Sequence, residues 1–303
     1  MKSANLSQFF QMRLNVFLFK LLPPSLSYFY LCSIGRLYYL VNRKEKAEIY
    51  RNVTEVFNHR CGSRERKRIA KGVFKGIFTH YFEKLFLAYY DLEKLKAFLL
   101  QRVEIHGLSK IQESLREGRG AILVTGHFGG VEFLPGTLAL HNCKLNMMVR
   151  CQTPTLKRIL HQRARSVQLS IIDCDTQSSN LFYAGLDCLK RNEVLITECD
   201  EVDKWSPSKG RTIDLLGHKL ILDRSLELLQ RRSRAPVLTV FVRRLKGRRY
   251  VLEINALDDF VETQEAPSIS SKLLKILERF VYLHPEQWYQ WKQFQRMKWT
   301  PAY

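Results

Sequence analysis

A histidine flanked by glycines is the residue of this chain best suited to moving a proton. His127 stands in the run GHFGGVE, residues 126–132, and an imidazole takes up and returns a proton near neutral pH. Glu132 lies five residues on, where its carboxylate can accept a hydrogen bond from the far ring nitrogen and fix the ring, as the acid of a catalytic triad does. No Ser or Cys adjoins His127, so the pattern favours a substrate hydroxyl as the nucleophile. A purely structural hydrogen bond between the two side chains is the alternative.

The glycines beside His127 predict a stretch of backbone that a ligand can approach closely. Without side chains, Gly129 and Gly130 can present their N–H groups to negative charge that develops on a substrate oxygen. We therefore expect both glycines to contact the substrate.

Two more predicted strands end in polar side chains. Residues 145–149 predict a strand that ends at Arg150, and residues 194–197 predict one that ends at Glu198 and Asp200. In an open α/β sheet the carboxyl ends of parallel strands meet at one edge, where such sheets bind their ligands. If these strands neighbour the one before His127, their polar side chains share one cleft.

These side chains suit a substrate with negative charge or hydroxyl groups. Arg150 can bind a phosphate through two hydrogen bonds or stabilise developing negative charge, and Asp200 can position an arginine or a substrate hydroxyl. Arg163, on the helix that follows Arg150, fits a surface or phosphate-facing position better than a catalytic one. Taken singly, each is better explained as a solvated loop charge, and only their convergence indicates a binding site.

Strand and helix patterns alternate from residue 103 onward, which predicts an α/β fold, a layered mixed sheet flanked by helices. We expect three units: an apolar segment at 1–41, a helical region at 42–100 and the α/β domain at 101–303. The predicted strands are 103–105, 121–124, 145–149, 169–172, 194–197, 212–215, 219–222, 236–243 and 250–254. The predicted helices of this part are 108–116, one that starts with 133–140, 155–167, 180–190, 225–232 and 268–282.

The first 41 residues are rich in apolar and aromatic side chains and predict a membrane-associated helical segment. Lys20, the pair Pro23-Pro24 and Arg36 break it into pieces shorter than the ~20 apolar residues that span a bilayer. Its tyrosines and cations fit the headgroup region, which favours two helices lying in the membrane interface. A buried helical hairpin and a single membrane span are the alternatives.

The 303 residues suffice to bury a full core, and their charge favours acidic partners. Lys and Arg number 49 against 29 Asp and Glu, a formal charge of +20, which suits an anionic membrane surface, an acidic protein or phosphorylated substrates. Nucleic acid is disfavoured, because no basic arm or nucleic-acid-binding motif accompanies the charge. The 7 cysteines include no Cys-x-x-Cys, which suits a reducing compartment and argues against a thiolate metal site.

Several motifs follow one another along the chain in a characteristic order. His-Phe-Gly at residues 127–129 is followed by Arg150 and, four residues later, Pro154, and Pro-Glu-Gln-Trp stands at residues 285–288. With the apolar N-terminus, this order resembles the lipid A secondary acyltransferases, the lauroyl and myristoyl acyltransferase family, within the broader His-x4-Asp/Glu glycerolipid acyltransferases. The resemblance covers nearly the whole chain and includes residues 21–23, 35–37, 50–53, 235–237 and 241–244.

The resemblance implies an enzyme that moves a fatty acyl chain from acyl carrier protein, or from acyl-CoA, to a hydroxyl of a membrane glycolipid such as a lipid A precursor. It implies a place on the cytoplasmic face of the bacterial inner membrane, and neither a metal nor a cofactor. By position, His127 is the general base and Glu132 its orienting partner, while Arg150 and Asp200 shape the polar end of the pocket. An acidic carrier protein and an anionic glycolipid both agree with the charge of +20.

Departures from the family pattern leave the acceptor open. Gly130 and Val131 stand where the family usually has Asn-Trp or a similar bulky pair, and residues 291–294 replace its Trp-x-His-Arg-Arg ending. A different glycolipid, a lysophospholipid or another lipid-linked product can therefore be the acceptor. Two other classes stay open: a catalytically silent lipid- or carrier-binding module, and a thioesterase or lipase that uses water, although no Gly-x-Ser-x-Gly motif is present.

Overall fold

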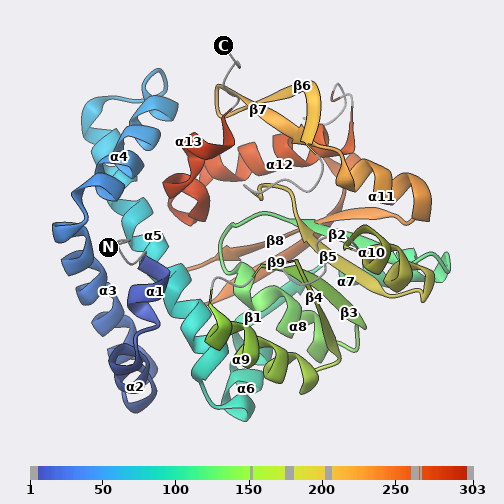
Figure 1. Ribbon diagram of the computed structural model, residues 1–303, viewed down its shortest axis with the longest axis horizontal. Helices are drawn as coiled ribbons and strands as arrows, with labels where there is room; N and C mark the ends of the chain where they lie inside the picture. Colours follow the sequence, from blue (N-terminus) through green and yellow to red (C-terminus); the bar gives the residue numbers. More distant parts are fainter. Residues whose placement is uncertain are drawn as a thin grey trace.

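Seven strands form one mixed sheet (Figure 1). The computed structural model describes residues 6–150, 153–174, 181–201, 207–260, 266 and 268–298. The strand order is β1-β9-β8-β2-β5-β3-β4, in which β8 and β9 are antiparallel and all other neighbours are parallel. The mixed α/β sheet predicted from the sequence is confirmed. Its strands are β1 (Val103–His106), β2 (Ala121–Thr125), β3 (Leu145–Val149), β4 (Leu169–Asp173), β5 (Val194–Glu198), β8 (Val237–Arg244) and β9 (Tyr250–Ala256).

The central strand β2 is apolar on both sides, which explains its place in the sheet. All its residues are buried. Ala121 and Leu123 belong to one apolar cluster, and Ile122 and Val124 belong to another on the opposite face. Helices α6, α7 and α8 contribute to the first cluster, and α10 and α11 to the second. These helices are α6 (Leu92–Arg102), α7 (Leu108–Arg116), α8 (Leu134–Leu140), α10 (Leu181–Lys190) and α11 (Ser225–Ser233).

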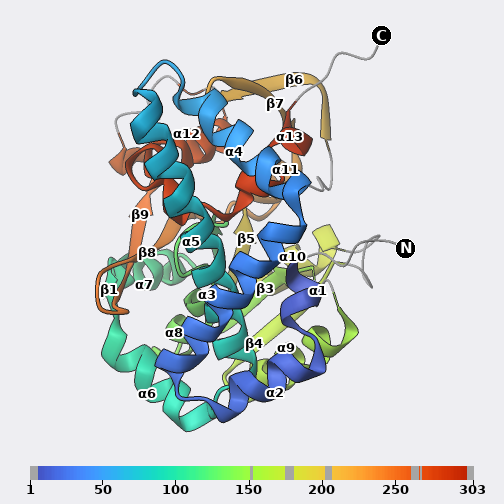
Figure 2. The ribbon, with the colours of Figure 1, turned by 90° about the vertical axis from the view of Figure 1, so that its left-hand side faces the viewer.

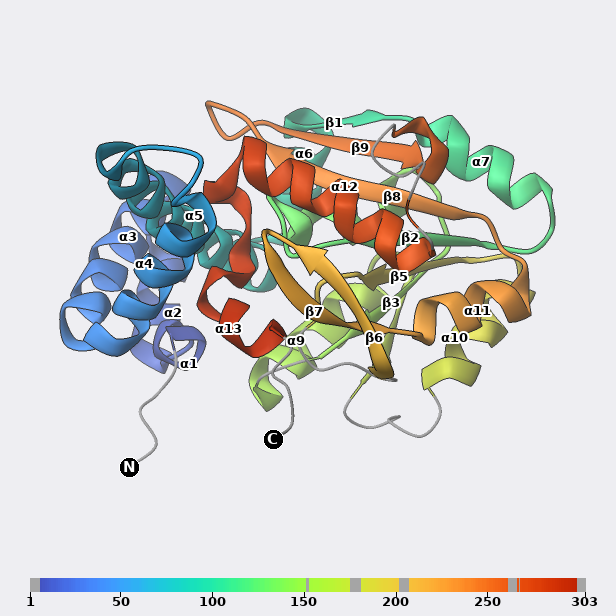
Figure 3. The same ribbon diagram turned by 90° about the horizontal axis from the view of Figure 1, so that it is seen from above.

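A hairpin and the C-terminal segment lie near the carboxyl end of β2 (Figure 3). The predicted hairpin is confirmed: β6 (Pro207–Leu215) and β7 (His218–Asp223) pair in antiparallel fashion and contact α12 (Ile269–Leu283). After α12 come three short helices, η4 (Pro285–Gln287), η5 (Tyr289–Lys292) and α13 (Phe294–Met297). Trp288, between η4 and η5, forms an antiparallel bridge with Phe128, so the chain returns to the loop that holds His127.

The N-terminal helices form a layer beside one end of the sheet (Figures 1 and 2). They are α1 (Leu6–Phe10), α2 (Arg13–Leu21), α3 (Pro24–Val41), α4 (Arg43–Phe57) and α5 (Ser63–Tyr89). The long helix α5 contacts α2, α3 and α4 on one side and η4 and η5 on the other, so it joins this layer to the C-terminal segment. The boundaries of the three predicted units stay predictions.

Helices α2 and α3 bury one side against α5 and expose apolar residues on the other. No helix among the residues placed by the structure is long and apolar enough to cross a membrane. The exposed apolar side chains of this layer are Met12, Leu14, Phe17, Leu21, Leu26, Phe29, Leu37, Leu40 and Val41.

Candidate active site

The predicted convergence of strand ends is confirmed. Strands β2, β5 and β3 are parallel neighbours in that order, so the residues that follow them lie at one edge of the sheet. His127 follows β2, Arg150 follows β3, and Glu198 and Asp200 lie at the end of β5. The order of the strands therefore brings these four side chains to the same edge of the sheet.

Asp200 binds both the ring and the backbone N–H of His127. Its carboxylate is fully buried, accepts from His127 Nδ1 at 2.9 Å, and accepts from the backbone N–H of the same residue at 3.0 and 3.1 Å. The indole Nε1–H of Trp288 donates to Asp200 Oδ2 at 2.8 Å. Burial disfavours the charged carboxylate, but His127 and these hydrogen bonds more than offset it and lower the pKa of Asp200. An ionised Asp200 places the ring proton on Nδ1 and the lone pair of neutral His127 on Nε2.

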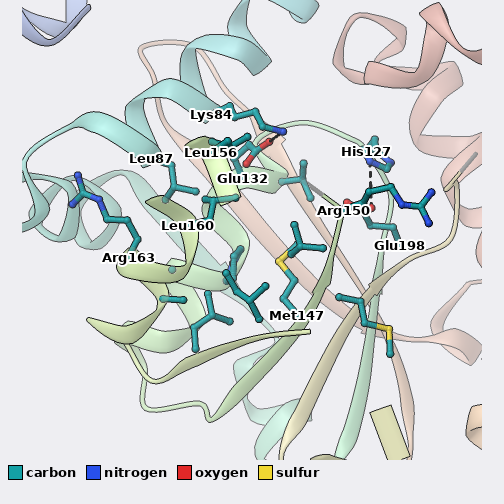
Figure 4. A pocket seen from close by; sticks show the side chains of 18 of the residues that line it. Lys84, Leu87, His127, Glu132, Met147, Arg150, Leu156, Leu160, Arg163 and Glu198 are labelled. Atoms are coloured by element: carbon teal, nitrogen blue, oxygen red, sulfur yellow. Dashed lines mark ion pairs between the residues drawn. The ribbon is translucent and has the colours of Figure 1, made fainter. Parts of the chain in front are cut away.

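Glu198 contacts the other ring nitrogen. His127 Nε2 lies 3.3 Å from Glu198 Oε2 (Figure 4). Burial lowers the pKa of His127, yet the carboxylates of Glu198 and Asp200 reverse this and raise it to about 10. Burial and neighbouring acids, Glu201 first among them, raise the pKa of Glu198 to about 7 despite His127. The imidazolium is thus stabilised on both sides of the ring.

Glu132 lines the same cavity but points toward α5. Its Oε1 lies 3.5 Å from His80 Nε2 and 3.5 Å from Lys84 Nζ (Figure 4). The sequence predicted that Glu132 binds a ring nitrogen of His127. Among the residues that the structure describes, however, the polar contacts of the two ring nitrogens are with Asp200, Glu198 and Gln290. The physical reason is the short helix η1 (Val131–Phe133), which carries Glu132 away along the cavity wall.

The neighbouring glycines serve the fold. The N–H of Gly129 donates to the Gln287 carbonyl at 2.8 Å, and that of Gly130 donates to the Val242 carbonyl at 2.8 Å. Gly129 has a φ of +59°, and a Cβ there would lie 1.7 Å from the Val242 oxygen. Both N–H groups predicted to face an oxyanion are therefore engaged with protein carbonyls.

The C-terminal segment supplies the second wall, which sequence reasoning from the histidine missed. The N–H of Tyr289 donates to the His127 carbonyl at 2.8 Å, and Gln290 Nε2 lies 3.1 Å from His127 Nδ1. The Tyr289 ring stacks on His127 with 6.2 Å between centroids, and it packs at a tilt against buried His80 with 4.0 Å between centroids. The only signal was the Pro-Glu-Gln-Trp motif, and its sequence distance from His127 concealed the contact.

A cavity of about 320 Å³ extends from His127 (Figure 4). His127, Glu132, Glu198 and Tyr289 line its polar end, which also includes His80, Lys84, Arg150, Glu201, Gln290 and Arg296. The rest of its lining is mostly apolar, with Lys96, Arg163 and Gln293 as polar exceptions, and comes chiefly from α5, α6, α8, α9 (Pro154–Arg165), β3 and β4. The apolar lining is Leu87, Leu92, Leu95, Leu99, Val131, Pro135, Leu140, Met147, Met148, Val149, Leu156, Leu160, Ala164, Val167, Leu169 and Ile171.

The two predicted arginines lie in different parts of this cavity. Arg150 lies beside His127 and Glu198, whereas Arg163 lies beyond Leu87 and Leu160 (Figure 4). Arg163 donates to the backbone carbonyl of Tyr90, which ties α9 to the end of α5. Of the two, Arg150 therefore has the position from which a cation can act at the reacting atoms.

Among the residues that the structure describes, one group of three side chains could hold a metal cation. His127, Glu198 and Glu201 offer three ligand atoms within 4.8 Å of one another. One of these atoms, His127 Nε2, already lies 3.3 Å from Glu198 Oε2.

The cavity, its polar end and the returning C-terminal segment belong to one continuous stretch of chain. No curated relative matches the chain. The family model described as bacterial lipid A biosynthesis acyltransferase matches residues 7–296, from within α1 to within α13. All the site residues above fall inside this range. The chain therefore belongs to the bacterial lipid A biosynthesis acyltransferase family.

Proposed function

We propose that this protein transfers a fatty acyl chain from a thioester donor, acyl carrier protein or acyl-CoA, to a hydroxyl of a lipid A precursor. The observation that carries the proposal is the cavity: a long apolar lining leads from α6 and α9 to a histidine held by a buried carboxylate. A hydrocarbon chain in the apolar part gains roughly 0.8 kcal/mol per buried methylene. Its thioester carbonyl then lies at the polar end beside His127.

Proton transfer at His127 accounts for the reaction without an enzyme nucleophile. Nε2 of neutral His127 removes the proton from the acceptor hydroxyl as that oxygen attacks the thioester carbonyl carbon. The tetrahedral intermediate collapses, the carbon–sulfur bond breaks, and the imidazolium returns the proton to the departing thiolate. Asp200 keeps the ring in the required tautomer, the role the sequence assigned to Glu132.

The remaining polar residues are assigned to substrate binding. Glu132, with Lys84 beside it, faces the cavity where an acceptor sugar can donate hydrogen bonds. Arg150 lies at the reacting end and is assigned to a phosphate of the acceptor or to charge on the thioester oxygen. Both donors carry phosphate groups, and the net charge of +20 favours an acidic carrier.

The exposed apolar residues of α2 and α3 support attachment to a membrane surface. Phe17, Leu21 and Phe29 are each more than half exposed, and Arg13, Lys20 and Arg36 accompany them on these helices. Apolar side chains bordered by cations suit the interface of an anionic bilayer. We assign this face to the cytoplasmic leaflet of the bacterial inner membrane, where a lipid acceptor and a soluble donor meet.

Lipid mass spectrometry of cells that carry the wild type or His127→Ala tests the function. We expect a glycolipid one acyl chain lighter in the variant, with phospholipids unchanged. His106→Ala is the matched control, because His106 also contacts a carboxylate, Glu104 at 2.6 Å, but on the exposed surface. Equal lipid profiles for both variants would contradict the proposal, and release of free fatty acid without an acylated lipid would identify a hydrolase.

The assignment of Asp200 and Glu132 is tested by their amide variants. Asp200→Asn keeps the shape but permits the wrong tautomer, and we expect kcat to fall by roughly 10³–10⁴ with little change in KM. Glu132→Gln is expected to raise the KM for the acceptor more than it lowers kcat. The reverse pattern would return the orienting role to Glu132.

A further inference from the structure

A second hollow lies among the N-terminal helices, apart from the active site. It has a volume of about 600 Å³ and lies between α3, α4 and α5, the helices in the foreground of Figure 2. We call it the α3–α5 hollow. Its lining residues are Tyr28, Phe29, Cys32, Arg36, Tyr39, Leu40, Lys46, Tyr50, Lys67, Ala70, Lys71, Phe74, Lys75 and Phe78, and the active-site cavity shares none of them.

The floor of the hollow is apolar and closely packed. Gly35 allows α3 to approach α5, because a Cβ at this position would lie 2.5 Å from the Phe78 ring. The Tyr39 ring packs edge-on against Phe74 at 5.0 Å between centroids. Phe29 and Leu40, which are 67% and 62% exposed, extend this apolar surface to the outside of the layer. The hollow therefore has room and contacts for hydrocarbon.

Its rim carries five cations and no acid. Arg36, Lys46, Lys67, Lys71 and Lys75 are all exposed, and none of them takes part in an ion pair between residues that the structure describes. Uncompensated like charges around one hollow repel one another, and an anion bound between them relieves that repulsion. The rim thus complements a negatively charged group.

We propose that the α3–α5 hollow binds one anionic glycerophospholipid, with its phosphate at the lysine rim and the start of an acyl chain on the aromatic floor. A lipid is favoured over an acidic protein because the floor is continuous with Phe29 and Leu40 on the apolar outer face. The site rests on the proposed membrane attachment and not on acyl transfer, because its lining shares no residue with the active-site cavity. Its role is to hold the layer on the membrane in one orientation.

Flotation with vesicles of phosphatidylcholine, with or without phosphatidylglycerol, tests this site. The variant is Lys71→Gln/Lys75→Gln, and the matched control is Arg64→Gln/Arg68→Gln, which removes two exposed cations of the same helix outside the hollow. We expect the lysine variant to lose roughly tenfold or more of the preference for phosphatidylglycerol, since each basic residue near an anionic surface contributes about 1 kcal/mol. The control is expected to lose much less.

Native mass spectrometry in detergent distinguishes a site from diffuse attraction. We expect one phosphatidylglycerol retained by the wild type and by the arginine control, and none by the lysine variant. Equal losses in both variants, displacement of the lipid by inorganic phosphate alone, or displacement by acyl carrier protein would each overturn the proposal. No acyl donor is used, so failed acyl transfer leaves this result unaffected. A wild type that binds no vesicles at all would refute membrane attachment and the lipid site together.

Discussion

In the proposed mechanism, the carboxylates at the two ring nitrogens of His127 act on different steps. Asp200 fixes the tautomer and stays ionised, because Trp288 and the His127 backbone donate to it. Glu198 lies at Nε2, the nitrogen that must accept a proton, and there it stabilises the imidazolium. The two carboxylates that hold the His127 ring in place thus also keep it protonated at neutral pH. Burial alone would lower the pKa of His127, but the carboxylates raise it to about 10.

This balance predicts an unusual pH dependence. Only neutral His127 acts as a base, so kcat/KM should rise with pH through the neutral range, about tenfold per pH unit below the pKa. Glu198→Gln removes the charge at Nε2, which should lower the pKa of His127 by about one to three units and shift the rise to lower pH. Activity at pH 7 should then increase.

The pH–rate profile of both proteins, measured on detergent-dispersed acceptor, checks this shift. Glu193→Gln is the control, because Glu193 lies just before the other end of β5 and pairs with Arg191. If the kcat/KM profile of Glu198→Gln rises at the same pH as that of the wild type but is lower at every pH, Glu198 binds substrate instead.

At the scale of elements, the C-terminal segment positions His127 and Asp200. Trp288 and Trp291 are both fully buried, and each indole N–H donates one hydrogen bond: Trp288 to Asp200 at 2.8 Å and Trp291 to the Pro285 carbonyl at 2.7 Å. Only the first bond stabilises the charge that orients His127.

Replacing each tryptophan with phenylalanine separates this function from packing. Trp288→Phe removes a hydrogen bond to a buried charge, worth roughly 1.5–3 kcal/mol, so kcat should fall about 10- to 100-fold with the KM for the donor unchanged. Trp291→Phe makes the same change in the ring and should mainly lower the free energy of unfolding. Equal kcat losses, alongside equal losses of stability, would reduce Trp288 to a packing residue.

Helix α9 should set the length of acyl chain that the cavity accepts. Leu160 lines the apolar part, whereas its neighbour Ile159 does not line the cavity. Leu160→Trp shortens the space for hydrocarbon, and we expect kcat/KM for long-chain donors to fall about tenfold relative to donors two methylenes shorter. Ile159→Trp should leave that ratio unchanged. A uniform loss for all chain lengths in Leu160→Trp would indicate a damaged fold.

The elements could be predicted from the sequence because each strand carries its own signal. The apolar run of β2 and the hairpin around Gly217 needed no knowledge of their neighbours. The predicted bounds agree closely with the observed ones except for β6, which begins at Pro207 and not at residue 212. The partner of His127 could not be predicted in the same way. Glu132 is near in sequence, but Asp200 is near in space because β2 and β5 are neighbours. The contact of Trp288 with Asp200 could not be predicted either, because it depends on the C-terminal segment returning to the His127 loop, and no local sequence pattern indicates that return.

At the scale of the whole molecule, the N-terminal layer and the sheet are joined by buried polar contacts as well as apolar ones. Asn52 of α4 donates to the Trp291 carbonyl at 2.7 Å, and the hydroxyls of Tyr81 and Tyr289 lie 2.8 Å apart. Arg244 of β8 forms two hydrogen bonds with fully buried Glu83 of α5, at 2.7 and 2.8 Å. These contacts connect the N-terminal layer to the wall of the candidate active site.

These contacts predict that the layer and the sheet unfold together. Arg244→Met leaves Glu83 buried without its cation, which should lower the free energy of unfolding by about 3–5 kcal/mol. The matched control is Arg243→Met, because Arg243 pairs with half-buried Glu253 at 2.8 Å and such a pair contributes about 0–1 kcal/mol. Chemical denaturation, followed by tryptophan fluorescence for the C-terminal segment and by circular dichroism for the helices, measures both. Coincident transitions that shift together in Arg244→Met are expected. Two separate transitions, with only the helical one shifted, would show that the N-terminal helices fold as an independent unit and that the buried pair does not couple them to the site.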